Sequence, residues 1–229
     1  MPIAACIFDA YGTLFDVGAA ARRAASEPGA GAWSHRWPEL AENWRRKQLE
    51  YTWIRASAGA HIDFWQVTQD GLDWALERAG LGDAPLRERL LALYRELDAY
   101  PEVPEVLTRL TEAGRRCAIL SNGTPGMLAA AIGSAGIGAA LEAALSVEEV
   151  GVFKPDARVY GLVEARLGVR PAEVLFVSSN GWDACTGAAF GFTAVWVNRE
   201  GAPVDRLHGR PAHVLGDLSG LPELVARIG

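Results

Sequence analysis

The chain has 229 residues, of which 50% are hydrophobic and 22% charged, so it can form one or two domains and is too apolar for a disordered or fibrous protein. Its 22 basic and 28 acidic residues leave a net charge of -6, which argues against a nucleic-acid partner, because phosphate contacts need an excess of basic side chains. An anionic small molecule is compatible with this charge, since a locally positive pocket can lie inside an acidic protein.

The cysteines and the uncharged segments indicate a protein of the cytoplasm. The three cysteines are odd in number and widely spaced, which predicts neither a disulfide framework nor a zinc site and is typical of a reducing compartment. The opening stretch MPIAACIFDAYG has no basic start and is interrupted by Asp9, so we expect no secretory signal. No charge falls between Arg116 and Glu142, but polar residues interrupt this stretch, so we expect no membrane span and no membrane partner.

Short apolar runs alternate with helical patterns along most of the chain. The apolar runs predict strands over 3–8, 117–120, 174–177 and 194–197. Helical periodicity predicts helices near 104–114, 126–135, 157–167 and 219–228. Continuous apolar strands that alternate with helices favour an α/β fold, in which a parallel sheet is covered by helices on both faces.

The segment 16–96 differs from the rest, because it has long helical patterns and no convincing strand. It also holds six of the eight tryptophans. A helical insertion after the first strand would lie above the carboxyl ends of a parallel sheet, where open α/β sheets bind ligands. We therefore predict a helical cap over 16–96 and an α/β core formed by 1–15 and 97–229. A separate helical domain is the alternative interpretation.

Polar motifs follow the predicted strands. Asp9 comes directly after the first strand, SNGT occupies 121–124, Lys154 follows Phe153, and SSNGWD occupies 178–183. By itself Asp9 is equally well explained as the cap of its own turn. Together and in this order, at the tips of strands of one sheet, the motifs resemble the haloacid dehalogenase superfamily. This resemblance implies a Rossmann-like core with an inserted helical cap.

Most members of that superfamily are phosphatases, and two positions of this chain depart from the phosphatase pattern. Tyr11 stands where a phosphatase carries a second aspartate, the general acid. Ser179 stands where the last motif usually has another acid, which leaves only Asp183 beside Asp9 to bind Mg²⁺. A hard cation needs several oxygen ligands, and an alkoxide leaving group needs a proton donor. Both departures disfavour phosphate chemistry.

Displacement of a halide from carbon needs neither the metal nor the second acid. Halides leave without protonation, and the carbon under attack is neutral. We therefore expect no metal and no cofactor. A phosphatase acting on a small phosphate ester is the alternative enzyme. A non-catalytic binding protein is the third interpretation, and the retention of Asp9, Lys154 and Asp183 argues against it.

The stretches DAYGTLFDV, WRRKQLEYTW, SNG, KPDARVY and FVSSNGWDA resemble the L-2-haloacid dehalogenase family. The resemblance implies that Asp9 attacks C2 of a short L-2-haloalkanoate and forms an ester, a case of covalent catalysis. Water then hydrolyses the ester at the Asp9 carbonyl, so C2 is inverted once and a D-2-hydroxy acid is released. Asp183 would activate this water, and Asn180 and Lys154 would place it.

Further positions take their roles from the same resemblance. The substrate-binding residues that it implies are Tyr11, Arg45, Leu49, Phe64, Ser121, Asn122, Tyr160 and Trp182. Arg45 and Asn122 would accept the halide, while Ser121 and main-chain N–H groups near Tyr11 would bind the substrate carboxylate. The apolar and aromatic members would form the pocket wall, with Tyr160 near the lysine.

Two residues complete the implied catalytic set. Thr13 and Ser178 match family residues that orient the nucleophile and the water network. For these two and for Tyr160, packing in a turn or in the core explains the residue type almost as well.

Spacing alone leaves the role of Arg45 open. Arg45, Leu49 and Trp53 fall on one helical stripe, which indicates an arginine that points toward a dry place. The alternative is a solvated basic face formed by Arg45 and the two basic residues after it, with Glu42 as a surface partner. The family resemblance favours the first interpretation.

The chain also departs from the family at several positions. Arg46 stands where relatives often have a glutamine near the pocket, and 26–38 does not follow the family, so both put the shape of the pocket in question. The histidines show no metal spacing, and we interpret them as surface or capping residues. They are His35, His61, His208 and His213. The resemblance also implies a homodimer formed through the helical insertion.

Overall fold

The computed structural model describes residues 3–229, whose core is a six-stranded sheet in the order β3-β2-β1-β4-β5-β6. All neighbouring strands are parallel. The strands are β1 (Ala5–Phe8), β2 (Arg116–Ser121), β3 (Ala143–Ser146), β4 (Val174–Ser178), β5 (Thr193–Val197) and β6 (His213–Leu215). The predicted α/β class with a Rossmann-like parallel sheet is confirmed.

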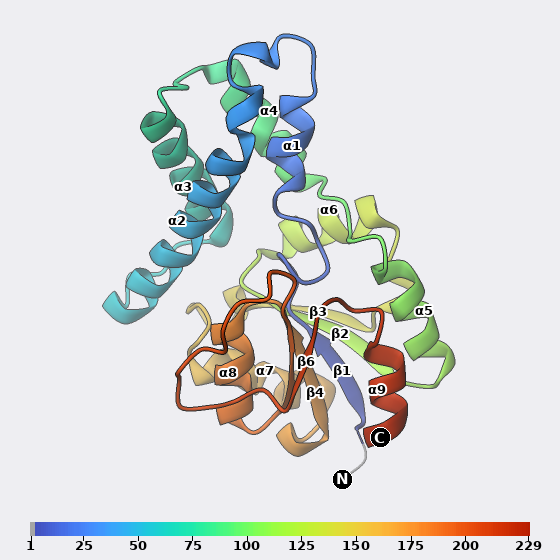
Figure 1. The fold of residues 1–229 in the computed structure, drawn as a ribbon. Helices are drawn as coiled ribbons and strands as arrows, with labels where there is room; N and C mark the ends of the chain where they lie inside the picture. Colours follow the sequence, from blue (N-terminus) through green and yellow to red (C-terminus); the bar gives the residue numbers. More distant parts are fainter. Residues whose placement is uncertain (1–2) are drawn as a thin grey trace.

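Helices cover both faces of this sheet, as the continuous apolar strands require. Figure 1 shows α5 and α9 together on one face, with α7 and α8 on the other. The core helices are α5 (Val103–Glu112), α6 (Pro125–Ala135), α7 (Ala157–Leu167), α8 (Gly181–Phe190) and α9 (Leu221–Ile228). Every residue of the central strand β1 is buried, so the strand's tip is rigidly placed.

Three elements had no clear signal in the sequence. The edge strands β3 and β6 are only partly buried, so they lack the continuous apolar run of the central strands. Helix α8 has the sequence GWDACTGAAF, whose small residues give no apolar stripe. The sequence pattern therefore misses elements whose residues carry no continuous apolar run and no apolar stripe.

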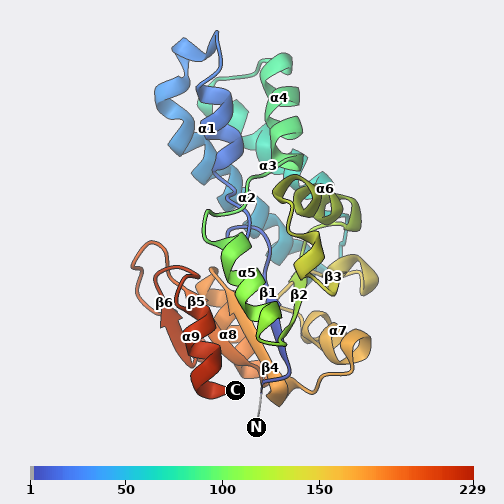
Figure 2. The same ribbon diagram turned by 90° about the vertical axis from the view of Figure 1, so that its right-hand side faces the viewer.

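The helical segment consists of α1 (Ala19–Ala25), α2 (Trp37–Ala58), α3 (Phe64–Ala79) and α4 (Ala84–Arg95). It lies above the carboxyl ends of the strands in Figure 1, and Figure 2 shows it as a distinct body joined to the core at that level. Helix α2 begins at a Trp-Pro pair and ends at Gly59, whose φ of 63° suits glycine. The boundaries at 16 and 96 stay a prediction.

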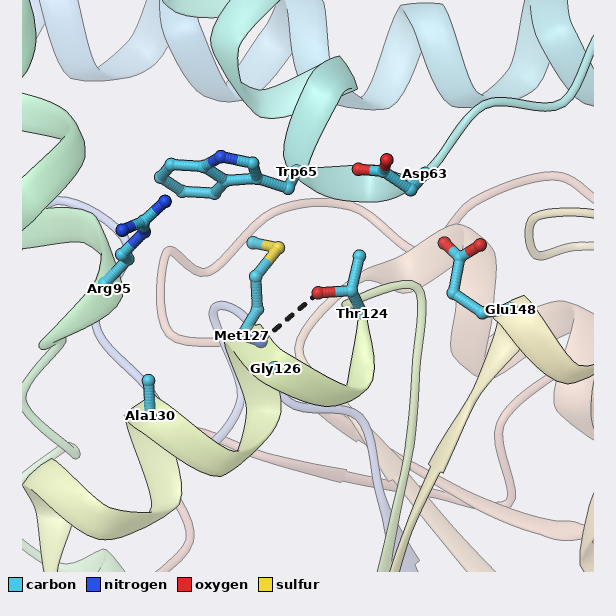
Figure 3. A pocket seen from close by; sticks show the side chains of 8 residues that line it. All are labelled: Asp63, Trp65, Arg95, Thr124, Gly126, Met127, Ala130 and Glu148. Atoms are coloured by element: carbon cyan, nitrogen blue, oxygen red, sulfur yellow. Dashed lines mark hydrogen bonds between the residues drawn. The ribbon is translucent and has the colours of Figure 1, made fainter.

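A cleft separates α3 and α4 from the core on one side of the molecule (Figure 3). Asp63, Trp65 and Arg95 line it from the cap, and Thr124, Met127 and Glu148 line it from the core. At its edge, Glu148 accepts hydrogen bonds from the Phe64 N–H at 3.3 Å and contacts His61 Nε2 at 3.0 Å. One core carboxylate thus holds the first turn of α3.

The prediction that His61 is an ordinary surface or capping residue is therefore wrong. Its ring packs on Phe153 with 4.7 Å between centroids, and it links cap and core through Glu148. Cys185 is buried in α8, and all three cysteines are free. No helix within residues 3–229 combines the length and the apolar character that crossing a membrane needs.

Candidate active site

The Asp9 carboxylate lies at the centre of the sheet, just beyond β1. The strand order turns at β1, whose neighbours β2 and β4 lead off in opposite directions, and ligands of open α/β sheets bind at such a point. Asp9 Oδ1 accepts a hydrogen bond from Lys154 Nζ at 3.2 Å. Asp9 Oδ2 accepts from Thr13 Oγ1 at 3.0 Å and from Asn180 Nδ2 at 3.1 Å. The carboxylate is thus held on both oxygens.

Lys154 joins this carboxylate to a second one. Its ammonium lies 3.2 Å from Asp9 and 2.9 Å from Asp183, and the side chain is 1% exposed. Burial alone would lower the pKa of Lys154, but the charges of Asp183 and Asp9 outweigh burial and raise that pKa above its ordinary value. The lysine therefore carries a full positive charge between two buried acids.

Lys154 does not follow a strand, so the prediction that it marks a strand tip is wrong. The preceding strand β3 ends at Ser146, and a loop carries the chain on to Lys154. Asn122 places this loop, because its Oδ1 accepts the Lys154 main-chain N–H at 3.0 Å. The lysine reaches the site through this contact with the loop after β2.

Asp183 lies in the first turn of α8 and is fully buried. Its Oδ2 accepts from Lys154 and from Ser178 Oγ, both at 2.9 Å, and its Oδ1 accepts from Tyr160 OH at 2.7 Å. Burial raises the pKa of Asp183, Lys154 lowers it, and the charge of Asp9 raises it again, so the net direction is upward. A carboxylate with a raised pKa is suited to accept a proton.

Tyr160→Phe should lower the free energy of unfolding and should also make that free energy depend less on pH under alkaline conditions. Burial and the charge of Asp183 hold the pKa of Tyr160 well above its ordinary 10.0. The hydroxyl therefore adds stability that is complete below pH 10 and is lost as the pH rises toward the folded-state pKa. We expect the variant to lose about 1–3 kcal/mol at neutral pH, because Asp183 loses a buried donor.

Urea unfolding at rising pH measures this effect. Above pH 10 the free energy of unfolding should fall more steeply in the wild-type chain than in Tyr160→Phe. Tyr51→Phe is the control for the loss of a tyrosine hydroxyl, because Tyr51 lies on α2 and lines a separate surface pocket with Ile54 and Asp70. Parallel curves for wild type and Tyr160→Phe would contradict the prediction.

Arg45 reaches the site from the cap. Its Nη2 donates to the Tyr11 carbonyl at 3.0 Å and to Asn180 Oδ1 at 3.2 Å. Asn180 therefore contacts the Asp9 carboxylate with its amide nitrogen and Arg45 with its amide oxygen. The alternative that Arg45 belongs to a solvated face is wrong, whereas its neighbours Arg46 and Lys47 do pair with Glu50 on the outer side of α2.

These side chains, apart from Asp183, line a small cavity with about 10 Å³ of space open to water, while Asp183 lies behind Lys154. Its lining residues are Asp9, Tyr11, Arg45, Leu49, Phe64, Ser121, Asn122, Lys154, Asn180 and Trp182. Tyr160, predicted to bind substrate, does not line the cavity and lies behind Asp183 instead. Arg46 and 26–38 do not line it either, so the contour that they put in question is set by other residues.

Tyr11 and Phe64 give the cavity an aromatic wall, and the tyrosine that packs behind Tyr11 was not predicted. The Tyr11 ring stacks on Tyr94 with 5.8 Å between centroids and lies 5.9 Å from Phe64. A Cβ on Gly123 would lie 2.7 Å from the Tyr11 ring, so only glycine fits there. Tyr94 belongs to α4 and has no motif around it, so no sequence signal could have placed it behind the Tyr11 ring.

Ser121 and Asn122, the predicted donors for an anion, also line the cavity. Ser121 Oγ accepts the Gly123 N–H at 3.0 Å, which directs its own proton elsewhere. No group of three or more histidine, cysteine, aspartate or glutamate side chains within residues 3–229 is arranged to hold a metal ion. The positive charge next to Asp9 and Asp183 comes from Lys154.

Comparison with known proteins gives consistent matches. A family model described as haloacid dehalogenase-like hydrolase matches residues 3–191. The (S)-2-haloacid dehalogenase 1 of Pseudomonas sp. (strain CBS-3) is 46% identical over 99% of this chain and 98% of its own. The (S)-2-haloacid dehalogenase 4A of Burkholderia cepacia is 43% identical over 97% of this chain and 95% of its own.

Solved structures agree with these relatives. The structure of L-2-haloacid dehalogenase from Xanthobacter autotrophicus with chloropropionic acid covalently bound is 38% identical, with a TM-score of 0.87, and covers 99% of this chain and 100% of its own. A crystal structure of a dehalogenase is 43% identical, with a TM-score of 0.91, over 97% of this chain and 96% of its own.

Proposed function

The chain belongs to the haloacid dehalogenase-like hydrolases, and on that premise we propose that it is an (S)-2-haloacid dehalogenase that hydrolyses short L-2-haloalkanoic acids to D-2-hydroxy acids. One observation carries the proposal: Asp9 faces a small cavity with Lys154 as its cation and Arg45 beside it. The carboxylate and the halogen of a haloalkanoate both need donors, and the polar residues that line this cavity offer them.

In the first step, an Asp9 oxygen forms a bond to C2 as the carbon–halogen bond breaks. The halide leaves with the electron pair and is accepted by Arg45 and Asn122, which both line the cavity. No proton is needed, which is consistent with Tyr11 at the position of the phosphatase acid. Ser121 and main-chain N–H groups near Tyr11 hold the substrate carboxylate.

In the second step, water attacks the carbonyl carbon of the Asp9 ester. Asp183 accepts the proton of this water, for which its raised pKa suits it. The bond between the Asp9 carbonyl carbon and the oxygen attached to C2 breaks, so the product keeps an Asp9 oxygen. C2 is inverted in the first step only, and the net reaction consumes one water and releases halide and one proton.

The surrounding residues hold this arrangement in place. Thr13 Oγ1 donates to Asp9 and accepts the Ser179 N–H at 2.8 Å, which fixes the nucleophile loop against β4. Ser178 Oγ donates to Asp183 and accepts the Asn180 N–H at 3.2 Å. The homodimer and the cytoplasmic location stay predictions.

Halide release from each enantiomer of 2-chloropropionate, measured in EDTA, tests the proposal. We expect release from the L enantiomer alone, with D-lactate as the product and the same rate in EDTA as in Mg²⁺. A small-molecule phosphatase would instead release phosphate from an ester such as p-nitrophenyl phosphate and would lose turnover in EDTA. Halide release from neither enantiomer would exclude the proposed function.

A further inference from the structure

Arg199 is a partly buried cation that the reaction described above does not use. It lies in the loop after β5, and its side chain is 19% exposed. Its Nη2 donates to the Thr13 carbonyl at 3.2 Å, and its Nη1 lies 2.8 Å from Glu102 Oε1. The guanidinium also lies over the Tyr100 ring, 3.6 Å from the centroid. Three groups on two chain segments thus converge on one side chain.

Those two segments are the linkers between core and cap. Asp16 N–H donates to the Asp98 carbonyl at 2.9 Å, and Tyr100 N–H donates to the Leu14 carbonyl at 2.9 Å. The outgoing and returning linkers therefore pair with each other in antiparallel fashion, as the bridge between Phe15 and Ala99 also shows. Any rotation of the cap relative to the core has to pass through this paired segment.

The outgoing linker is continuous with the loop that carries the nucleophile. Two arginines hold carbonyls of that loop: Arg45 from the cap binds Tyr11, and Arg199 from the core binds Thr13. The side chain of the same Thr13 donates to Asp9. Arg199 and Arg45 also line one outer cleft, which meets the catalytic cavity at Arg45 and Asn180.

We propose that Arg199 is a positioning residue, which fastens both linkers to the core and thereby sets where the cap delivers Arg45. A planar guanidinium can stack on Tyr100 while its two terminal nitrogens bind Glu102 and Thr13, which no other side chain can do together. This inference rests on the proposed function, in which Arg45 accepts the halide. Arg199 should therefore affect halide departure and leave ester hydrolysis, carried by core residues, unchanged.

The test compares 2-chloropropionate with 2-bromopropionate in Arg199→Met. The ratio kcat/KM reports the steps up to ester formation. Misplacing Arg45 should lower kcat/KM about tenfold to a hundredfold for the chloride, and clearly less for the bromide, which needs less help to leave. The decay of the Asp9 ester after a single turnover, followed by mass spectrometry, should keep the wild-type rate.

Arg199→Lys keeps the positive charge beside Glu102 but lacks the planar guanidinium. It should restore part of the kcat/KM for 2-chloropropionate. Arg109→Met is the control, because it removes only an exposed ion pair with Glu223, and it should match the wild type for both substrates. If Arg199→Met does not fold, Glu102→Gln removes the ion partner alone and should shift the chloride-to-bromide ratio in the same direction.

An equal loss of kcat/KM for 2-chloropropionate and 2-bromopropionate would overturn the positioning role, because a merely structural defect does not distinguish leaving groups. A slower decay of the Asp9 ester would also overturn it. Wild-type values of kcat/KM in Arg199→Met would overturn the positioning role as well. The wild-type measurement separates the two proposals: no halide release from the wild-type chain overturns the proposed function, whereas release by the wild type with either of these results overturns only the role of Arg199.

Discussion

Asp9→Asn should lower halide release from L-2-chloropropionate by about a thousandfold or more, because an amide oxygen is a poor nucleophile at saturated carbon. The amide keeps the size of the carboxylate, so the contacts with Thr13 and Asn180 can persist and the fold should be retained. The measurement is halide release with excess substrate, together with thermal unfolding. Asp156→Asn is the control, since Asp156 lies at the start of α7 and pairs with the exposed Arg158.

A single turnover in heavy-oxygen water distinguishes the covalent route from direct attack by water. If Asp9 forms the ester, the oxygen of the first product molecule comes from Asp9, and the label from water enters the Asp9 carboxylate. Mass spectrometry of the peptide that contains Asp9 should then find the label there. Label in the free hydroxy acid alone would contradict the covalent step, and retained turnover in Asp9→Asn would contradict the assignment of the nucleophile.

Lys154→Met should affect both stability and activity, because Asp9 and Asp183 share the ammonium as a hydrogen-bond partner. The substitution leaves two buried carboxylates without a cation, a defect that costs about 3–5 kcal/mol at neutral pH. Turnover should fall at least about a hundredfold, because neither the nucleophile nor the water-activating group keeps its position. Urea unfolding and halide release measure the two effects.

The pH dependence of the Lys154→Met defect has a definite sign. Without the ammonium, the pKa of Asp183 rises further above its ordinary 3.8, since burial and Asp9 raise it and the lowering effect of Lys154 is lost. A raised folded-state pKa adds stability below the unfolded value, and this stability is lost as the pH rises. The stability difference from wild type should therefore be small near about pH 4 and grow toward neutral pH.

The matched control is Lys47→Met, because Lys47 is the other of the two lysines in the chain. Lys47 pairs with Glu50 on α2 and its ammonium lies over the Trp74 ring, so Lys47→Met should lower the free energy of unfolding by about 1 kcal/mol and leave turnover unchanged. A pH-independent deficit in Lys154→Met, or a deficit equal to that of Lys47→Met, would show that the ammonium does not hold the two carboxylates.

The sequence alone was sufficient for the four central strands of the sheet and for the polar motifs that follow three of them. Continuous apolar runs identify the buried strands β1, β2, β4 and β5, because burial on both faces leaves a local signature in residue type. Asp9 comes directly after such a run, and the motifs at 121–124 and 178–183 follow two others. This pattern was enough to predict that the three motifs lie together at one edge of the sheet. Parallel strands bring their carboxyl ends together whatever the loops between them do.

Only the tertiary structure decided which neighbouring side chains serve the cavity. Arg45 and Arg46 are adjacent and alike, yet one binds Tyr11 and the other pairs with Glu50 outside. Lys154 meets Asp9 across 145 residues of chain, and the three partners of Arg199 lie on distant segments. Local patterns record which face of an element is buried, but a contact between distant segments depends on how the elements pack, and no single segment encodes that.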